Sequence, residues 1–302
     1  MLDVCLIGTS GMVPLKHRWL TAFHAVSEGH AILIDCGEGT QIAMSEASLR
    51  LKPIDTICLT HCHADHIAGL PGLLLTMGNQ GRTEKVTLIG PPGFSEIVRC
   101  LLVIAPLPFD VILCETDGKS GHVFKCGNIE IRPFAVKHVM PCLGYSLILP
   151  RGGRFDPEKA RALQIPVRCW SLLQKGETVT IDDKVIHPEA VVGPPRKGIH
   201  VVYSTDTRPV PEITEAGKNS DLMVLEGIYP GSEKLDKAKE WGHMTFEEAA
   251  RLAFNAHTKE LWLTHFSQSV ERPEDFLENA AAVFRNTKIG KDGMKKHFVF
   301  ED

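Results

Sequence analysis

The chain has 302 residues, of which 43% are hydrophobic and 23% are charged, and its formal net charge at pH 7 is -4. This composition is sufficient for a sizeable core, so it excludes a disordered chain, a collagen-like repeat and a small disulfide-stapled scaffold. The mild negative charge also excludes a molecule that is basic over its whole surface. A local basic patch could still bind nucleic acid.

The cysteines and the N-terminus indicate where the protein works. There are nine cysteines, an odd number, and they are scattered without any Cys-x-x-Cys pair. This pattern is typical of a reducing compartment, so we expect a cytoplasmic protein. Asp3 stands where a signal peptide would carry a basic residue, and no apolar run approaches the roughly 18 to 20 residues of a membrane span. We therefore expect no targeting segment and no membrane partner.

Short β-branched runs and helical patterns follow one another along the chain. Runs of this length that end in Gly, Asp or His are typical of strands, and longer amphipathic stretches are typical of helices. Together they predict a mixed α/β chain in which helices cover sheets. In chain order, the sequence predicts strands at 4–7 and 31–34, a helix at 39–47, a strand at 56–59, a helix at 67–76, a strand at 86–89, a helix at 94–104, strands at 129–135, 201–204 and 222–225, a helix at 246–257, a strand at 261–264 and a helix at 273–284.

Residues 151–198 differ from the rest of the chain. Glycines and prolines recur there often enough to break any long element. The segment has nine Lys and Arg against six Asp and Glu, a balance of +3 in an otherwise acidic chain. We predict a single domain over 1–302 that carries an inserted, arm-like segment at 151–198.

Four candidate metal ligands lie together in one strand-to-helix turn. His61, His63, Asp65 and His66 follow the predicted strand at 56–59 and precede an apolar helical run. Side chains two residues apart in an extended turn point the same way, and imidazole and carboxylate groups are ordinary metal ligands. The turn therefore favours a site for two metal ions rather than a solvated loop.

These four residues cannot fill two metal sites, so further ligands must come from elsewhere in the chain. His138, Asp206 and His265 each stand where a predicted strand gives way to a loop. In α/β proteins the ends of strands present the chemically active groups. We expect all three to join the first cluster.

These motifs identify a resemblance to the metallo-β-lactamase superfamily and, within it, to ribonuclease Z, the family of tRNA 3′-end processing endonucleases. The His-rich motif indicates the superfamily. The opening run, the Gly-Glu-Gly-Thr-Gln run and the Asp-Thr-Arg-Pro run indicate the ribonuclease Z branch. The resemblance covers most of the chain and is carried by residues 6–14, 35–41, 61–66, 69–73, 79–81, 193–195, 204–209 and 263–267.

The resemblance implies a fold, a metal content and a reaction. The fold would be the four-layer αβ/βα sandwich, with two Zn²⁺ per chain, although other divalent metals remain open. A metal-bridging hydroxide would attack phosphorus and trim precursor tRNA 3′ ends, and the protein would be a homodimer. In this ligand set His61, His63 and His138 hold one zinc, Asp65, His66 and His265 hold the other, Asp206 bridges them, and Asp65 also accepts a proton from the attacking water.

A sixth histidine and one further acid complete the candidates. Thr245 and Glu248 form a capping-box pattern, so His243 lies just ahead of a helix N-terminus, where phosphate is attracted. His243 could protonate the departing 3′ oxygen, or it could be a structural histidine beside the cap. Glu226 could orient a ligand or His243, or it could form a surface ion pair. The Gly-rich turn that contains Asp35 is expected to be scaffold beneath the metals.

One departure from the family keeps a second function open. In the resembling family the arm carries a Gly-Pro pair, where this chain has Val167, Arg168 and Cys169. The alternative is therefore a hydrolase of the same fold that acts on a small phosphodiester or another ester, with an altered arm that does not dock tRNA. A third reading is a non-catalytic, metal-stabilised binding module.

Overall fold

The computed structural model describes residues 1–182 and 184–301. The chain forms two compact units, which we call the main unit (Met1–Ile148 and His200–Phe298) and the inserted unit (Leu149–Ile199 and Val299–Asp302). The segment 151–198, expected to be an insertion, falls inside the second unit. In the described part of the chain, no helix is long and apolar enough to cross a membrane.

The first sheet of the main unit has seven strands in the order β16-β1-β2-β3-β4-β5-β6. Its strands β3 to β6 are parallel, so their carboxyl ends lie at one edge of the sheet. The strands are β1 (Leu2–Gly8), β2 (Ala22–Ser27), β3 (His30–Ile34), β4 (Ile54–Cys58), β5 (Val86–Gly90), β6 (Val111–Glu115) and β16 (Met294–Phe298).

The second sheet also has seven strands, in the order β15-β14-β13-β12-β9-β8-β7. Strands β12 to β15 are parallel, and β7, β8 and β9 form an antiparallel meander beside them. The strands are β7 (Phe124–Cys126), β8 (Ile129–Lys137), β9 (Pro141–Arg151), β12 (Arg196–Ser204), β13 (Leu222–Glu226), β14 (Leu261–Thr264) and β15 (Thr287–Ile289).

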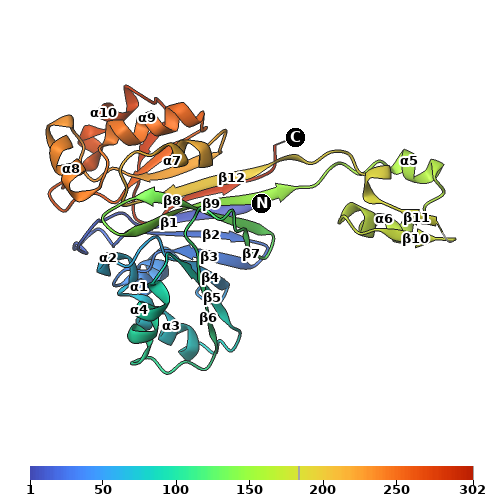
Figure 1. Ribbon diagram of the computed structural model, residues 1–302, viewed down its shortest axis with the longest axis horizontal. Helices are drawn as coiled ribbons and strands as arrows, with labels where there is room; N and C mark the ends of the chain where they lie inside the picture. Colours follow the sequence, from blue (N-terminus) through green and yellow to red (C-terminus); the bar gives the residue numbers. More distant parts are fainter. Residues whose placement is uncertain (183, 302) are drawn as a thin grey trace. The chain divides into compact units, whose positions relative to one another are not determined.

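Helices cover the outer faces of the two sheets, which makes four layers in the main unit (Figure 1). The sheets face each other, because Phe23 on β2 stacks on Tyr203 on β12 with ring centroids 5.5 Å apart. The mixed α/β sandwich expected from the sequence is therefore present. The helices of the main unit are α1 (Thr40–Glu46), α2 (Ala64–Ile67), α3 (Leu70–Asn79), α4 (Phe94–Leu102), α7 (Pro211–Ala216), α8 (Leu235–Trp241), α9 (Phe246–Ala256), α10 (Glu278–Ala281) and the 3-10 turns η2 (Ser232–Lys234) and η3 (Pro273–Phe276).

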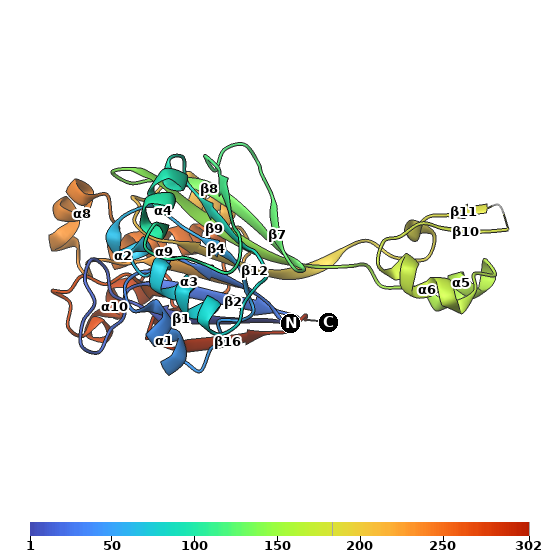
Figure 2. The ribbon, with the colours of Figure 1, turned by 90° about the horizontal axis from the view of Figure 1, so that it is seen from below.

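The inserted unit contains only short elements, as its glycines and prolines predict (Figure 2). Its small apolar core is made by Ala160, Ile165, Leu173, Val179 and Val191. Its elements are α5 (Pro157–Ala162), α6 (Val167–Gln174), β10 (Val179–Ile181), β11 (Lys184–Ile186) and the 3-10 turn η1 (Pro188–Ala190).

Two predicted helices were wrong in extent. The helix expected at 67–76 is divided into α2 and α3, because the N–H of Gly69 donates to the carbonyl oxygen of Cys36 at 2.9 Å instead of continuing the helix. The helix expected at 273–284 is a 3-10 turn followed by the short helix α10.

Candidate metal centre

The candidate ligands lie at the ends of strands that belong to both sheets. His61 follows β4 of the first sheet, while His138, Asp206 and His265 follow β8, β12 and β14 of the second. The parallel pairing of β12, β13 and β14 brings the last two of these strand ends to one edge. The side chains expected at separate strand ends therefore converge on one place.

Three residues that come just after strands β3, β12 and β14 have left-handed backbone conformations. The φ angles are 62° at Asp35, 52° at Asp206 and 58° at His265. This conformation costs a residue with a Cβ about 1–2 kcal/mol, so it persists only where the surrounding structure enforces it. Left-handed residues that follow strands turn the chain sharply. The turns bring the side chains of Asp206 and His265 into the centre and the Asp35 carboxylate to the outer nitrogen of His66.

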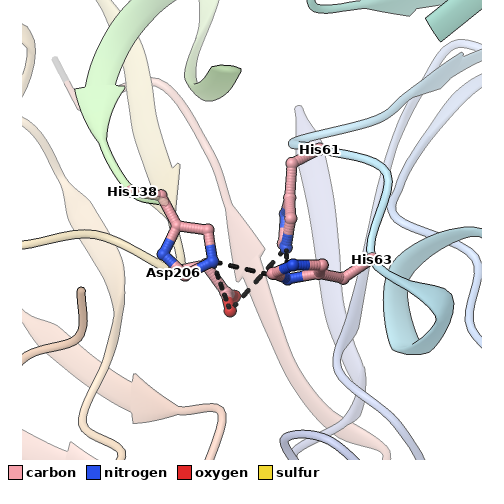
Figure 3. A group of neighbouring side chains, drawn as sticks. All are labelled: His61, His63, His138 and Asp206. Carbon is pink, nitrogen blue, oxygen red and sulfur yellow. Dashed lines mark hydrogen bonds and ion pairs between the residues drawn. The ribbon is translucent and has the colours of Figure 1, made fainter. Parts of the chain in front are cut away.

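The first group of side chains is His61, His63, His138 and Asp206, drawn in Figure 3. The Nδ1 atom of His63 lies 2.9 Å from His61 Nε2 and 3.4 Å from His138 Nε2. Asp206 Oδ1 lies 3.9 Å from His61 Nε2 and 4.0 Å from His138 Nε2. All four ligand atoms lie within 4.8 Å of one another, which is compact enough to surround one ion.

The second group is Asp65, His66 and His265. The two histidine Nε2 atoms lie 3.3 Å apart, and Asp65 Oδ2 lies 3.4 Å from His66 Nε2 and 3.5 Å from His265 Nε2. Asp206 Oδ2 approaches the same two nitrogens at 3.2 Å each. Asp206 therefore directs one carboxylate oxygen toward each group.

The donor atoms fit a divalent cation better than they fit one another. Burial lowers the pKa of His61, His63 and His138, so these rings keep a nitrogen lone pair for a ligand. Asp206 Oδ2 is buried and accepts no hydrogen bond from any described residue. Facing lone pairs and an unpartnered buried carboxylate oxygen are what a metal ion would satisfy.

The charge around His66 supports the same conclusion. Burial opposes protonation of this ring, but Asp206, Asp35 and Asp65 outweigh it and raise the pKa of His66 well above its ordinary value. Burial likewise opposes ionisation of Asp65, yet His66 and His265 hold the pKa of its carboxyl far below the usual range. Three carboxylates around one ring create a negative potential that favours a cation.

Outer partners fix the orientation of three candidate ligands. Asp35 Oδ2 lies 2.9 Å from His66 Nδ1, Thr60 Oγ1 lies 3.0 Å from His61 Nδ1, and the Gly242 carbonyl oxygen lies 3.3 Å from His138 Nδ1. Such partners select the ring nitrogen that faces a metal. We expected Asp35 only as scaffold, and the structure instead places its buried carboxylate against His66. Its position directly after a buried strand was the one available signal.

His243 and Glu226 form a buried pair beside the two groups. His243 Nδ1 lies 3.0 Å from Glu226 Oε2. Glu226 is fully buried and also accepts backbone hydrogen bonds from Thr207 and Met244, so the surface ion pair considered for it is wrong. Burial lowers the pKa of His243, but the charge and hydrogen bond of Glu226, together with Asp206, outweigh burial and raise it to about 9.

The helix N-terminus beside His243 is built as the sequence predicts. Thr245 and Glu248 form a capping box at the start of α9. Sequence reasoning missed the role of Arg208, whose guanidinium donates to the carbonyl oxygen of His243 and to both carboxylate oxygens of Glu248. Arg208 lies two residues after Asp206, so it ties the Asp206 loop to the segment that carries His243. Its only signal was its place in the 204–209 motif.

Comparison with family sequence patterns gives two partial matches. Residues 190–266 match the pattern described as "Beta-lactamase superfamily domain". Residues 2–104 match the pattern described as "Anti-Pycsar protein Apyc1". The first match includes Asp206 and His265, and the second includes His61 to His66.

Similarity to whole proteins is more extensive. The chain is 51% identical over 303 residues to a protein named Ribonuclease Z from Agathobacter rectalis, with 100% of both chains covered. It is 50% identical to another of the same name from Lachnospira eligens, with 100% and 99% covered. The crystal structure of the short form of human tRNase Z matches with a TM-score of 0.70 at 23% identity, with 99% and 100% covered, which shows the shared fold. This fold and the His/Asp cluster make the chain a divalent-metal hydrolase, and it belongs to the ribonuclease Z family.

Proposed function

We propose that this protein is a zinc-dependent endoribonuclease that removes 3′ extensions from precursor tRNA. The observation that carries the proposal is the convergence of two ligand groups on the opposite oxygens of Asp206. Relatives that are half identical over the full length bear the name Ribonuclease Z. An endonuclease of this kind must hold one phosphodiester against two cations, and the two groups offer that arrangement.

The two groups support a ligand assignment. His61, His63 and His138 would hold one zinc, with Asp206 as a shared ligand. Asp65, His66 and His265 would hold the other. Imidazole nitrogens with a few carboxylate oxygens are the ligands that Zn²⁺ takes in catalytic sites, although Mn²⁺ and Fe²⁺ accept them too. Two zinc ions per chain is therefore part of the proposal.

When bound, divalent ions in these positions would neutralise the phosphodiester and lower the pKa of a water molecule. Side chains of the protein would then accept and donate the protons of the reaction. Asp65 is partly exposed at the edge of the metal centre and would accept the proton of the attacking water. His243, oriented by Glu226 at 3.0 Å, would give a proton to the 3′ oxygen when the phosphorus–oxygen bond breaks. The products are a 3′-hydroxyl on the tRNA and a 5′-phosphate on the trailer.

The cellular setting of the proposal is a homodimer in the cytoplasm. All nine cysteines are unpaired in the described structure, which suits a reducing compartment. In a dimer, the inserted unit of one subunit would contact tRNA at the active site of its partner. Sedimentation of the purified protein would give twice the mass of 33.3 kDa if this part of the proposal holds.

The test compares two substrates with one enzyme preparation. The protein, its zinc content measured by elemental analysis, is incubated with precursor tRNA and with bis(p-nitrophenyl) phosphate. We expect one endonucleolytic cut that leaves a 3′-hydroxyl on the tRNA. Brisk turnover of the small diester with intact precursor tRNA would overturn the proposal.

That opposite outcome would favour the second candidate, a hydrolase of small phosphodiesters or other esters. The observation behind it is the arm: Val167, Arg168 and Cys169 form the first turn of α6 where the resembling family has its Gly-Pro pair. A helical turn presents a different backbone from an extended Gly-Pro segment, so tRNA docking could be lost while the metal centre is kept.

A further inference from the structure

Three apolar side chains are strongly exposed beside the polar metal centre. Met12 is 58% exposed, Val139 is 62% exposed and Trp241 is 56% exposed. They come from three separate segments. Met12 is hydrogen-bonded to the candidate ligand Asp65, Val139 directly follows the candidate ligand His138, and Trp241 directly precedes Gly242, a partner of His138. We call these three residues the apolar rim.

Met12 is fixed to the second ligand group. Its backbone N–H donates to Asp65 Oδ2 at 2.8 Å, and its φ angle is 70°, a conformation unfavourable for a residue with a side chain. The neighbouring N–H of Gly11 donates to the carbonyl oxygen of Phe266 at 3.0 Å. A Cβ at Gly11 would lie 2.8 Å from the His265 ring, so the turn packs directly on the centre. The structure thus enforces a strained turn that presents an apolar side chain to solvent.

Val139 and Trp241 lie beside the first ligand group. Val139 directly follows His138. Trp241 ends α8 and directly precedes Gly242, whose carbonyl oxygen lies 3.3 Å from His138 Nδ1. A Cβ at Gly242 would lie 3.0 Å from that same nitrogen, so the two segments are in contact. Within residues 1–182 and 184–301, no ring contact or hydrogen bond occupies the Trp241 indole.

We propose that the apolar rim stacks on the nucleobases on either side of the cleaved phosphodiester, an inference that rests on the proposed function. Apolar and aromatic faces beside a phosphate site are what single-stranded nucleic acid uses for base stacking. The two ligand groups meet different oxygens of Asp206. Met12 adjoins one group, and Val139 and Trp241 adjoin the other, so a phosphodiester held between the groups would have an apolar residue on each side. A Met side chain adapts to different bases, which suits trailers of varied sequence.

The position of His243 sets the direction of the RNA. His243 would protonate the departing 3′ oxygen, and Trp241 is only two residues away in the chain. The nucleotide that carries this oxygen, on the 5′ side of the cleaved bond, therefore stacks on Trp241. Met12, held on Asp65 in the other ligand group, contacts the first trailer nucleotide.

The experiment uses three precursor RNAs: the intact sequence, one abasic on the 5′ side of the cleaved bond and one abasic on the 3′ side. We expect Trp241→Ala to lower kcat/KM about tenfold on the intact RNA and to change nothing on the 5′-abasic RNA. Met12→Ala should lower it about threefold on the intact RNA and change nothing on the 3′-abasic RNA. Metal content should match the wild type in both variants.

Matched variants separate stacking from folding. Phe254→Ala removes an aromatic side chain that is 51% exposed near the end of α9 and should leave every rate unchanged. Met12→Leu keeps an apolar side chain, so it should lose less kcat/KM on the intact RNA than Met12→Ala does. Met12→Gly relieves the strained φ, so it should raise Tm and still lose activity as Met12→Ala does.

The outcomes distinguish a failure of base stacking from a failure of the proposed function. If Trp241→Ala and Met12→Ala lose as much activity on the abasic RNAs as on the intact RNA, the base-stacking inference is wrong. Recovery of full activity by Met12→Gly would also overturn it. If the wild type cleaves none of the three precursors, the proposed function fails instead.

Discussion

The main unit and the inserted unit differ in how their residues are buried. The main unit holds large apolar cores on the outer faces of both sheets, and its chemically active side chains lie at buried strand ends. The inserted unit has a core of five small and medium side chains. It also has a groove of about 1120 Å³ whose lining includes the basic residues Arg154, Lys159, Arg161 and Lys175.

This difference separates chemistry from recognition. A metal centre must hold its ligands within a few tenths of an ångström, which only a rigid, well-packed scaffold provides. Contact with a phosphate backbone needs positive charge on a surface, but the charged groups need not be placed precisely. The main unit is built for the first task, and the inserted unit has the composition for the second.

The largest effect should come from the residue shared by the two ligand groups. Asp206→Ala removes an oxygen from each group, so we expect metal loss together with an activity loss greater than the roughly 10–100-fold that loss of an outer partner costs. Elemental analysis and precursor cleavage check this, with Asp236→Ala at a fully exposed carboxylate as the control. A variant that kept two zinc ions would show that Asp206 does not bridge them.

The next effect should come from His243, which tests whether the main unit separates metal binding from proton transfer. We expect His243→Ala to lower turnover by about 10²–10⁴, the usual contribution of a general acid, with metal content near the wild type. Steady-state rates and elemental analysis give the two readouts. Turnover equal to the wild type would remove the acid role, and loss of metal would make His243 a ligand.

Glu226 gives a pH-dependent version of the same test. The Glu226 carboxylate helps to raise the pKa of His243 to about 9, so His243 stays protonated below that pH. Glu226→Gln removes the negative charge and lowers this pKa. The alkaline fall of the kcat profile should therefore move to lower pH, while the drop in kcat at its optimum stays within roughly 10–100-fold. An unmoved alkaline limb would mean that Glu226 does not act through His243.

The smallest effect on chemistry should come from the inserted unit. Arg154→Ala and Lys175→Ala should weaken precursor tRNA binding several-fold and reduce the salt slope of log K by about 1 each. Turnover of bis(p-nitrophenyl) phosphate should stay the same, because that substrate needs only the metal centre. Glu158→Ala, which removes an acid from the same groove, serves as the control with the opposite expected sign. Unchanged RNA affinity in all three variants would mean that the groove of the inserted unit does not contact tRNA.

Much of the site was predictable because its signals are local. His61, His63, Asp65 and His66 stand in one turn, and His138, Asp206 and His265 each follow a recognisable strand. The capping box of α9 was likewise visible in the sequence and was confirmed. The partners of these residues were less visible. Asp35 meets His66 and Arg208 meets His243 only after distant segments pack together, so neither contact leaves a mark in the spacing of residues.

The order of strands and helices is dictated by the pattern of apolar, glycine and proline residues, because that pattern decides locally whether a segment can bury one face. The convergence of strand ends from two sheets depends instead on how those sheets pack, and the same packing enforces the left-handed conformations at Asp35, Asp206 and His265. Such conformations are unfavourable for an isolated residue and are sustained only by long-range contacts. For this reason the residue types of the centre could be predicted from the sequence, while their distances, their partners and the apolar rim were decided by the tertiary structure.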